Sequence, residues 1–270
     1  MKQILLLTDF SQSANNATHF ALNFFAKETC QFYLMYVHKT RSFTMDDLVS
    51  NSRKSVYSTL LNKEKQQLKN YKTHLQNTYS QHSFSTIIDY DNLLSAIKQT
   101  IQSKSINLIV AGYDGSTNLF EMVFGSNTLQ IIRNIECPTL IIPEEFEHHS
   151  PKDILLPLDK NDSLDSVEFG RLLSFLNIDN SHFHILRISN NEELISIDKT
   201  QLENKLNSYD YHMIKNVSFA DAVSTYQQLN KIDLIGLIVE KESFIKRLIT
   251  ESATTKISKS LSLPLLIVHH

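Results

Sequence analysis

Short apolar runs alternate with segments of helical periodicity along the first half of the chain. The runs have the length of β-strands and cover residues 2–7, 32–37, 84–89 and 106–111. Between them, apolar residues recur every three or four positions and predict helices within residues 14–25, 43–79 and 93–103. This alternation predicts an α/β fold with a doubly wound parallel sheet, in which ligands bind at the carboxyl ends of the strands.

The same pattern starts again after a polar, proline-containing linker at residues 144–153. Residues 232–268 align with residues 106–142 without a gap, at a shift of 126 positions. We therefore expect two tandem Rossmann-like domains, at residues 1–146 and 151–270.

Three of the five glycines in the chain lie close together, at Gly112, Gly115 and Gly125. The apolar run before them reads as a buried strand that ends directly at Gly112, and Ser126 is placed as the N-cap of a helix. Glycine lets the backbone approach a ligand, and a helix N-terminus presents free N–H groups to an anion. The stretch predicts a phosphate site; the alternative is that the glycines serve only tight turns and close helix packing.

The spacing of these glycines, G-x2-G-x9-G-S, is followed by Cys137-Pro138 and another apolar run. Near the start of the chain, Thr8-Asp9 follows the first strand. These residues resemble the nucleotide signature, the last strand and the first acidic turn of the universal stress protein family, in its tandem two-domain form. The resemblance implies a fold like that of the adenine nucleotide alpha hydrolases, with ATP as the ligand.

The resemblance also implies a role for each site residue. Asp9 is expected at the adenosine end, and the backbone of Val37 beside the adenine ring. The phosphates are expected at Gly112, Gly115, Gly125 and Ser126. The alternative for Asp9 is a turn carboxylate after the strand, and a simple N-cap is compatible with phosphate binding by Ser126.

The second copy lacks the glycine turn. Asp159 takes the place of Asp9, but Ile238, Lys241 and Glu251 stand where the first copy has its glycines. Side chains at these positions hinder backbone approach to a ligand, and the glutamate opposes a triphosphate. We therefore expect one ATP per chain, held by the first domain.

The composition of the chain limits the kinds of partner that it is expected to bind. The formal charge is −3 and the lysines and arginines are scattered, which argues against nucleic acid. No run approaches the ~18 apolar residues of a membrane helix, so no membrane partner is expected and the predicted location is cytoplasmic. The two cysteines, Cys30 and Cys137, adjoin predicted strands, which is typical of buried thiols rather than of a disulfide framework.

No base, metal cage or cation for phosphoryl transfer is found beside the glycines, so no catalytic residue and no metal ligand is assigned. Asp9 and Asp114 are candidates for coordinating Mg²⁺ through the nucleotide. The favoured function is an ATP-binding stress-response or signalling module. The alternatives are a slow ATPase or phosphotransferase and a non-binding assembly scaffold.

The two copies end in matching strands, at residues 139–142 and 265–268. Family members pair through this strand, and pairing covers an edge that otherwise invites aggregation. The resemblance therefore implies an intramolecular pseudo-dimer of the two domains, and a homodimer of the whole chain is a further option.

Overall fold

The computed structural model describes residues 1–38, 51–90, 92–113, 125–146, 150–239 and 263–270, with the backbone alone for 51–61, 125 and 126. The first half of the chain contains β1 (Lys2–Leu7), α1 (Gln12–Phe24), β2 (Cys30–Val37), α2 (Asn51–Thr78), β3 (Ser83–Asp89), α3 (Leu93–Lys104), β4 (Leu108–Tyr113), α4 (Gly125–Asn134) and β5 (Thr139–Pro143). The second half contains β6 (Asp153–Asp159), α5 (Val167–Leu173), β7 (His182–Ile188), α6 (Glu193–Glu203), β8 (Tyr209–Ile214), α7 (Phe219–Leu229), β9 (Leu234–Val239) and β10 (Leu265–His269).

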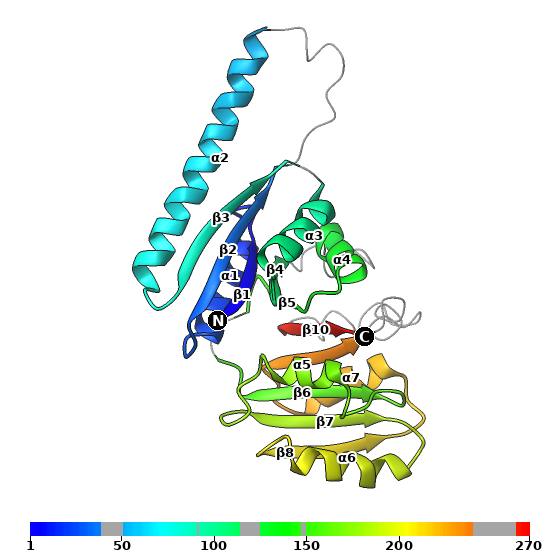
Figure 1. Cartoon of the computed structure of the whole chain (residues 1–270). Coiled ribbons are helices and arrows are strands. Elements are labelled where there is room, and N and C mark those ends of the chain that lie inside the picture. Colours follow the sequence, from blue (N-terminus) through cyan, green and yellow to red (C-terminus); the bar gives the residue numbers. More distant parts are fainter. Residues whose placement is uncertain (39–50, 91, 114–124, 147–149, 240–262) are drawn as a thin grey trace.

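The strands of the described residues form one ten-stranded sheet in the order β3-β2-β1-β4-β5-β10-β9-β6-β7-β8. Neighbouring strands are parallel except β5 and β10, which pair antiparallel at the centre. Read from each outer edge toward the centre, the two halves have the same strand order. Figure 1 shows β5 and β10 between the two halves, with α2 extending along the outer side of the first half.

The register of the strands matches the shift seen in the sequence. In the first half Ile109 lies opposite Thr139, and in the second half Ile235 lies opposite Leu265, each 126 positions later. At the central pair Leu140 lies opposite Leu266. Because the flanking pairs are equivalent under the same shift, the register has an approximate two-fold relation about Leu140 and Leu266.

Apolar side chains cover both faces of the sheet, as a doubly wound fold requires. On one face a single core cluster joins residues of α1, α2, α5 and α6 and continues from Leu140 to Leu266 across the central pair. Two clusters on the other face include α3, α4 and α7. The two halves thus share a continuous core on the α1 and α5 face.

Helix α1 illustrates how local sequence sets these elements. Ser11 is its N-cap and accepts a hydrogen bond from the backbone N–H of Ala14. Ala17, Phe20 and Ala21 then recur on the buried face of the helix. No helix in the described parts of the chain is both long and apolar enough to cross a membrane.

Both cysteines are free thiols. Cys30 is buried and Cys137 is partly exposed, and burial raises the pKa of Cys30 to about 11 and that of Cys137 to about 12. The thiolate forms are therefore scarce at neutral pH, and neither group has the lowered pKa of a reactive cysteine.

Candidate functional site

A cavity of about 590 Å³ lies at the carboxyl ends of β1, β2 and β4 in the first half. Its volume falls within the ~300–1,000 Å³ typical of small-molecule sites. The strand ends, together with the first turns of α1, α3 and α4, provide the lining: Leu7, Thr8, Asp9, Ser11, Ser13, Ala14, Met35, Val37, His38, Asn92, Leu93, Ala111, Gly112, Asn127, Thr128, Gln130 and Ile131.

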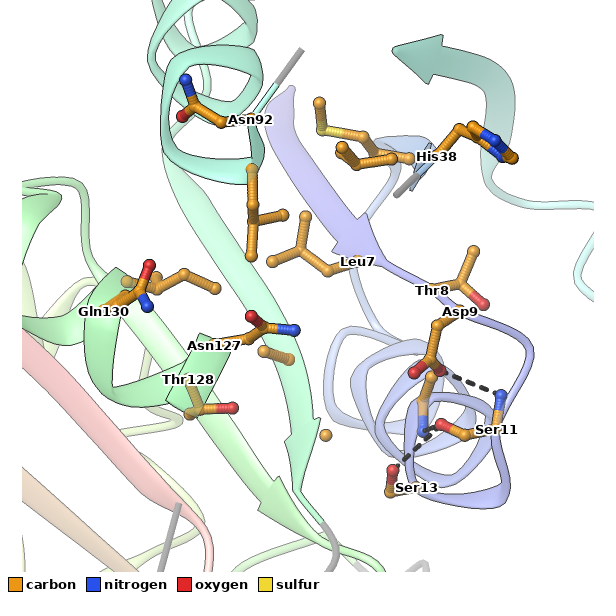
Figure 2. A pocket seen from close by; sticks show the side chains of 17 residues that line it. Leu7, Thr8, Asp9, Ser11, Ser13, His38, Asn92, Asn127, Thr128 and Gln130 are labelled. Carbon is orange, nitrogen blue, oxygen red and sulfur yellow. Dashed lines mark hydrogen bonds between the residues drawn. The ribbon is translucent and has the colours of Figure 1, made fainter. Parts of the chain in front are cut away.

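Three of the residues expected at the site, Asp9, Val37 and Gly112, line this one cavity. Gly125 and Ser126 begin α4, whose next residues, Asn127 and Thr128, also line it. Gly115 lies outside the described residues, as do Asp114, Lys241 and Glu251. Figure 2 shows Asp9, Ser11 and Ser13 on one side of the cavity and Asn127 and Thr128 on the other.

Asp9 takes part in the turn between β1 and α1. Its Oδ1 accepts a hydrogen bond from the backbone N–H of Ser11, at 3.0 Å. The turn role considered as an alternative is therefore present, and the carboxylate also borders the cavity. The turn bond leaves the second carboxylate oxygen and further lone pairs of Asp9 available.

Three helices begin at the cavity. Ser11 caps α1, and Asn92 caps α3 by accepting from the backbone N–H of Ser95 at 2.9 Å. Helix α4 begins at Gly125. Each helix N-terminus carries a partial positive charge, and the described lining contains no lysine or arginine. Among the described lining residues, the groups able to hold an anion are therefore N–H groups and hydroxyls.

The structure corrects the expected position of Gly112. Strand β4 begins two positions later than predicted and continues through Gly112, which pairs with Ile142, to Tyr113. A Cβ at Gly112 would lie 2.2 Å from the carbonyl oxygen of Ser13. The glycine is therefore required for close packing of α1 on the strand, the alternative raised for the glycine cluster.

The expected N-cap at Ser126 is also corrected. Helix α4 begins at Gly125, so Ser126 lies in its first turn rather than before it. The error is one or two residues, the usual uncertainty of helix boundaries read from sequence.

Several cavity residues escaped the sequence analysis, among them Ser13, His38, Asn92, Asn127 and Thr128. They share one signal, which is a polar residue in the first positions after a strand or in the first turn of a helix. Asn92 follows β3 and is the N-cap of α3.

The corresponding region of the second half is filled differently. Ile238, at the position that matches Gly112, is 3% exposed and belongs to the core cluster that also contains Leu158 and Leu164. Helix α5 begins only at Val167, after residues 160–166, whereas residues 8–11 join β1 to α1. A side chain in place of the glycine is incompatible with the close helix approach seen in the first half.

A buried ion pair holds the loop after β6. The Arg187 guanidinium, 0% exposed, binds both carboxylate oxygens of Asp198, at 2.7 and 2.8 Å, and donates to the backbone carbonyls of Asp159 and Asp162. Tyr211 donates its hydroxyl to Asp198 at 2.7 Å. Burial alone would lower the pKa of Arg187, but the Asp198 carboxylate outweighs it and the pKa is raised. The positive charge of Arg187 therefore has a structural role.

Comparison with solved structures shows the same fold over nearly the whole chain. A universal stress protein from Archaeoglobus fulgidus DSM 4304 is 13% identical, with a TM-score of 0.67 over 99% of this chain and 98% of that one. A protein of unknown function from Pseudomonas aeruginosa PAO1 is 13% identical, with a TM-score of 0.55 over 100% and 92%. The cytoplasmic domain of a prokaryotic cation chloride cotransporter is 9% identical, with a TM-score of 0.59 over 98% and 94%.

Sequence comparison identifies the family. No curated protein matches the chain. The profile of the universal stress protein family, however, matches residues 1–143, more than half of the 270 residues. That region contains β1 to β5 and the cavity described above. The chain therefore belongs to the universal stress protein family.

Proposed function

We propose that this protein binds one molecule of ATP in the cavity of the first half and acts in the cytoplasm as a stress-response or signalling module. The observation that carries the proposal is the convergence of Asp9, Val37 and Gly112 with the start of α4 around one cavity. Family membership supports the stress-response role, and the cavity supports the nucleotide.

The chemistry of the lining suits a nucleotide. Leu7, Met35 and Val37 supply an apolar region suited to a base. Ser11, Ser13 and Thr128 supply hydroxyl groups close to helix N-termini, where phosphate oxygens are favoured. In Figure 2 Leu7 and His38 lie toward one end of the cavity, and Ser13 and Thr128 lie toward the other.

The stoichiometry follows from the difference between the halves. Ile238 fills the core where Gly112 permits close approach of a helix in the first half. The proposal is therefore one site per chain, within an intramolecular pseudo-dimer of two tandem domains joined through β5 and β10. Association of whole chains into a homodimer is compatible with this arrangement.

Titration calorimetry of the purified chain with ATP tests the proposal. We expect one equivalent of ATP to bind, and Gly125→Glu to abolish binding because a carboxylate would occupy the start of α4. Ser126→Ala should weaken binding by about one to two decades, the range for one hydrogen bond to a charged group. Gly170→Glu is a matched control, because Gly170 is exposed in α5 with no atom within 4 Å of an added Cβ.

Two equivalent sites, or unchanged affinity in Gly125→Glu with an unchanged melting temperature, would contradict the proposal. Turnover measured in the same samples should stay near the uncatalysed background, since no positioned base is identified. A steady ATPase rate that disappears in Asp9→Asn would favour the enzyme alternative instead.

A further inference from the structure

A polar cluster lies in the second half, at the amino ends of β6, β7 and β8. In the strand register Asp153 lies opposite His182, and His184 lies opposite Asp210. Residues two apart on a strand share a face, so His182 and His184 point the same way. This is the face covered by α7, because Nδ1 of His184 lies 3.0 Å from the hydroxyl of Tyr226 on that helix.

The atoms of the cluster lie close enough together for small side-chain movements to bring them onto one metal ion. Nε2 of His182 lies 3.0 Å from Oδ2 of Asp210, and Nε2 of His184 lies 3.6 Å from Oδ1 of Asp153. One ligand atom each from His182, His184 and Asp210 lies within 4.8 Å of the other two. Tetrahedral Zn²⁺ with bonds of ~2.1 Å holds its ligand atoms ~3.4 Å apart. Small side-chain rotations would bring the three ligand atoms from within 4.8 Å to this separation.

Each of the two imidazole rings has a hydroxyl partner at Nδ1. Nδ1 of His182 lies 2.7 Å from the hydroxyl of Ser208, and Nδ1 of His184 is held by Tyr226. A hydroxyl that accepts from Nδ1–H gives a tautomer whose Nε2 lone pair can bind a metal, whereas the contact of 3.0 Å in this structure has Nε2–H of His182 donating to Oδ2 of Asp210. Metal-binding histidines characteristically have such a partner on the second nitrogen. Both Nε2 atoms then face the carboxylates.

His184 gives an independent indication of a missing ligand. The residue is 7% exposed, and its buried Nε2 has no hydrogen-bond partner. Oδ1 of Asp153 lies 3.6 Å from this nitrogen, beyond hydrogen-bond distance. Buried polar atoms are nearly always paired, so the exception calls for an explanation.

We propose that His182, His184 and Asp210 bind a divalent transition metal, with Zn²⁺ as the best fit, and that Asp153 completes or adjusts the coordination. Two imidazoles with carboxylates favour zinc over Mg²⁺ or Ca²⁺, which prefer oxygen ligands alone. The side chain of Asp210 is 58% exposed, so the ion can enter from solvent. The site lies at the amino ends of strands in the second half, so it does not depend on the ATP proposal.

The test is Zn²⁺ titration of the full chain after treatment with a chelator, followed by calorimetry, with Co²⁺ absorption as a second readout. The chain carrying His148→Gln and His149→Gln is the reference, because that vicinal pair could bind metal by itself. We expect one saturable site and a Co²⁺ spectrum of nitrogen and oxygen ligands. Asp210→Asn and His184→Gln should each weaken Zn²⁺ binding at least tenfold.

Two further variants serve as controls. One tests a residue that positions a ligand, and the other tests whether exposed histidines bind the metal nonspecifically. Tyr226→Phe removes the hydroxyl that orients His184 and should weaken Zn²⁺ binding by about 10- to 100-fold. His74→Gln removes an exposed imidazole on α2 and should leave affinity unchanged.

The proposal is overturned if the reference chain shows no saturable Zn²⁺ site, or if Asp210→Asn binds Zn²⁺ as the reference does. Asp210 is exposed, so this variant should fold even if His184→Gln does not, and circular dichroism checks both. Equal losses in His74→Gln would also overturn it, because they would indicate adventitious surface binding.

Discussion

At the scale of single residues, Gly112 and Gly170 offer a contrast in what a glycine does. A Cβ at Gly112 would meet the backbone of Ser13 at 2.2 Å, whereas one at Gly170 would meet nothing within 4 Å. Gly112→Ala must therefore push α1 away from β4, and we expect a loss of ~1–3 kcal/mol in the free energy of unfolding. Denaturant titration measures the change.

Gly170→Ala is the matched substitution. Gly170 lies within α5 on an exposed position, so alanine should stabilise the fold by ~0.4–1 kcal/mol through helix propensity and lower unfolded-state entropy. If the two substitutions changed the free energy of unfolding equally, the close contact between position 112 and Ser13 would not affect stability.

Single-residue roles were the least predictable part of the site from sequence. Asp9 and Val37 could be placed at strand ends, because Val37 ends an apolar run and Asp9 lies two residues after one, but their roles were implied only by the resemblance. The packing role of Gly112 was raised only as an alternative, because it depends on where α1 crosses β4. The cluster of His182, His184 and Asp210 was missed for the same reason, since only the register of β7 and β8 brings the three together.

At the scale of elements, the apolar runs predicted most strands to within two residues. The predicted strand at residues 2–7 matches β1, and residues 84–89 match β3 but for its first residue. Apolar runs succeed here because most of these strands are covered on both faces and lack an exposed polar side. Helix starts were less accurate, as at α4, because capping depends on local backbone geometry.

The network of Arg187 and Asp198 fixes the loop between β6 and α5 to β7 and α6. Arg187→Met would leave the Asp198 carboxylate, 2% exposed, with no cationic partner among the residues that the structure describes. We expect a loss of ~3–5 kcal/mol, the usual result of breaking one side of a buried ion pair. Adding Asp198→Leu should recover much of this loss, and chemical denaturation of the single and double variants measures both.

A surface pair provides the control. Nζ of Lys2 lies 2.6 Å from Oε2 of Glu28, but the Glu28 side chain is 46% exposed. Glu28→Gln should therefore change stability by less than ~1 kcal/mol. If Arg187→Met had a similarly small effect, the network would not determine the position of the loop.

At the scale of the whole molecule, the central pair of β5 and β10 makes one sheet of two halves. A fragment of residues 1–146 would leave the hydrogen-bonding edge of β5 uncovered, and uncovered edges recruit other strands. We expect the fragment to dimerise through β5 at micromolar concentration, with Leu140 near the two-fold axis. Light scattering coupled to size exclusion measures the mass.

The full chain is the reference for that experiment, because its β5 is already paired with β10. A fragment that remained a stable monomer at the same concentration would show that the central pairing is dispensable. Self-association of the full chain to the same degree would point to a surface elsewhere on the molecule.

The approximate two-fold relation about Leu140 and Leu266 also affects how mutations accumulate. In a homodimer one gene encodes both copies, so each substitution occurs twice and cannot distinguish them. In this chain the related positions are separate codons, as the pair Gly112 and Ile238 illustrates. Selection can therefore act on each half alone, provided that the central strands still fit each other. Because the two halves are covalently linked, they can evolve different functions while remaining part of a single sheet.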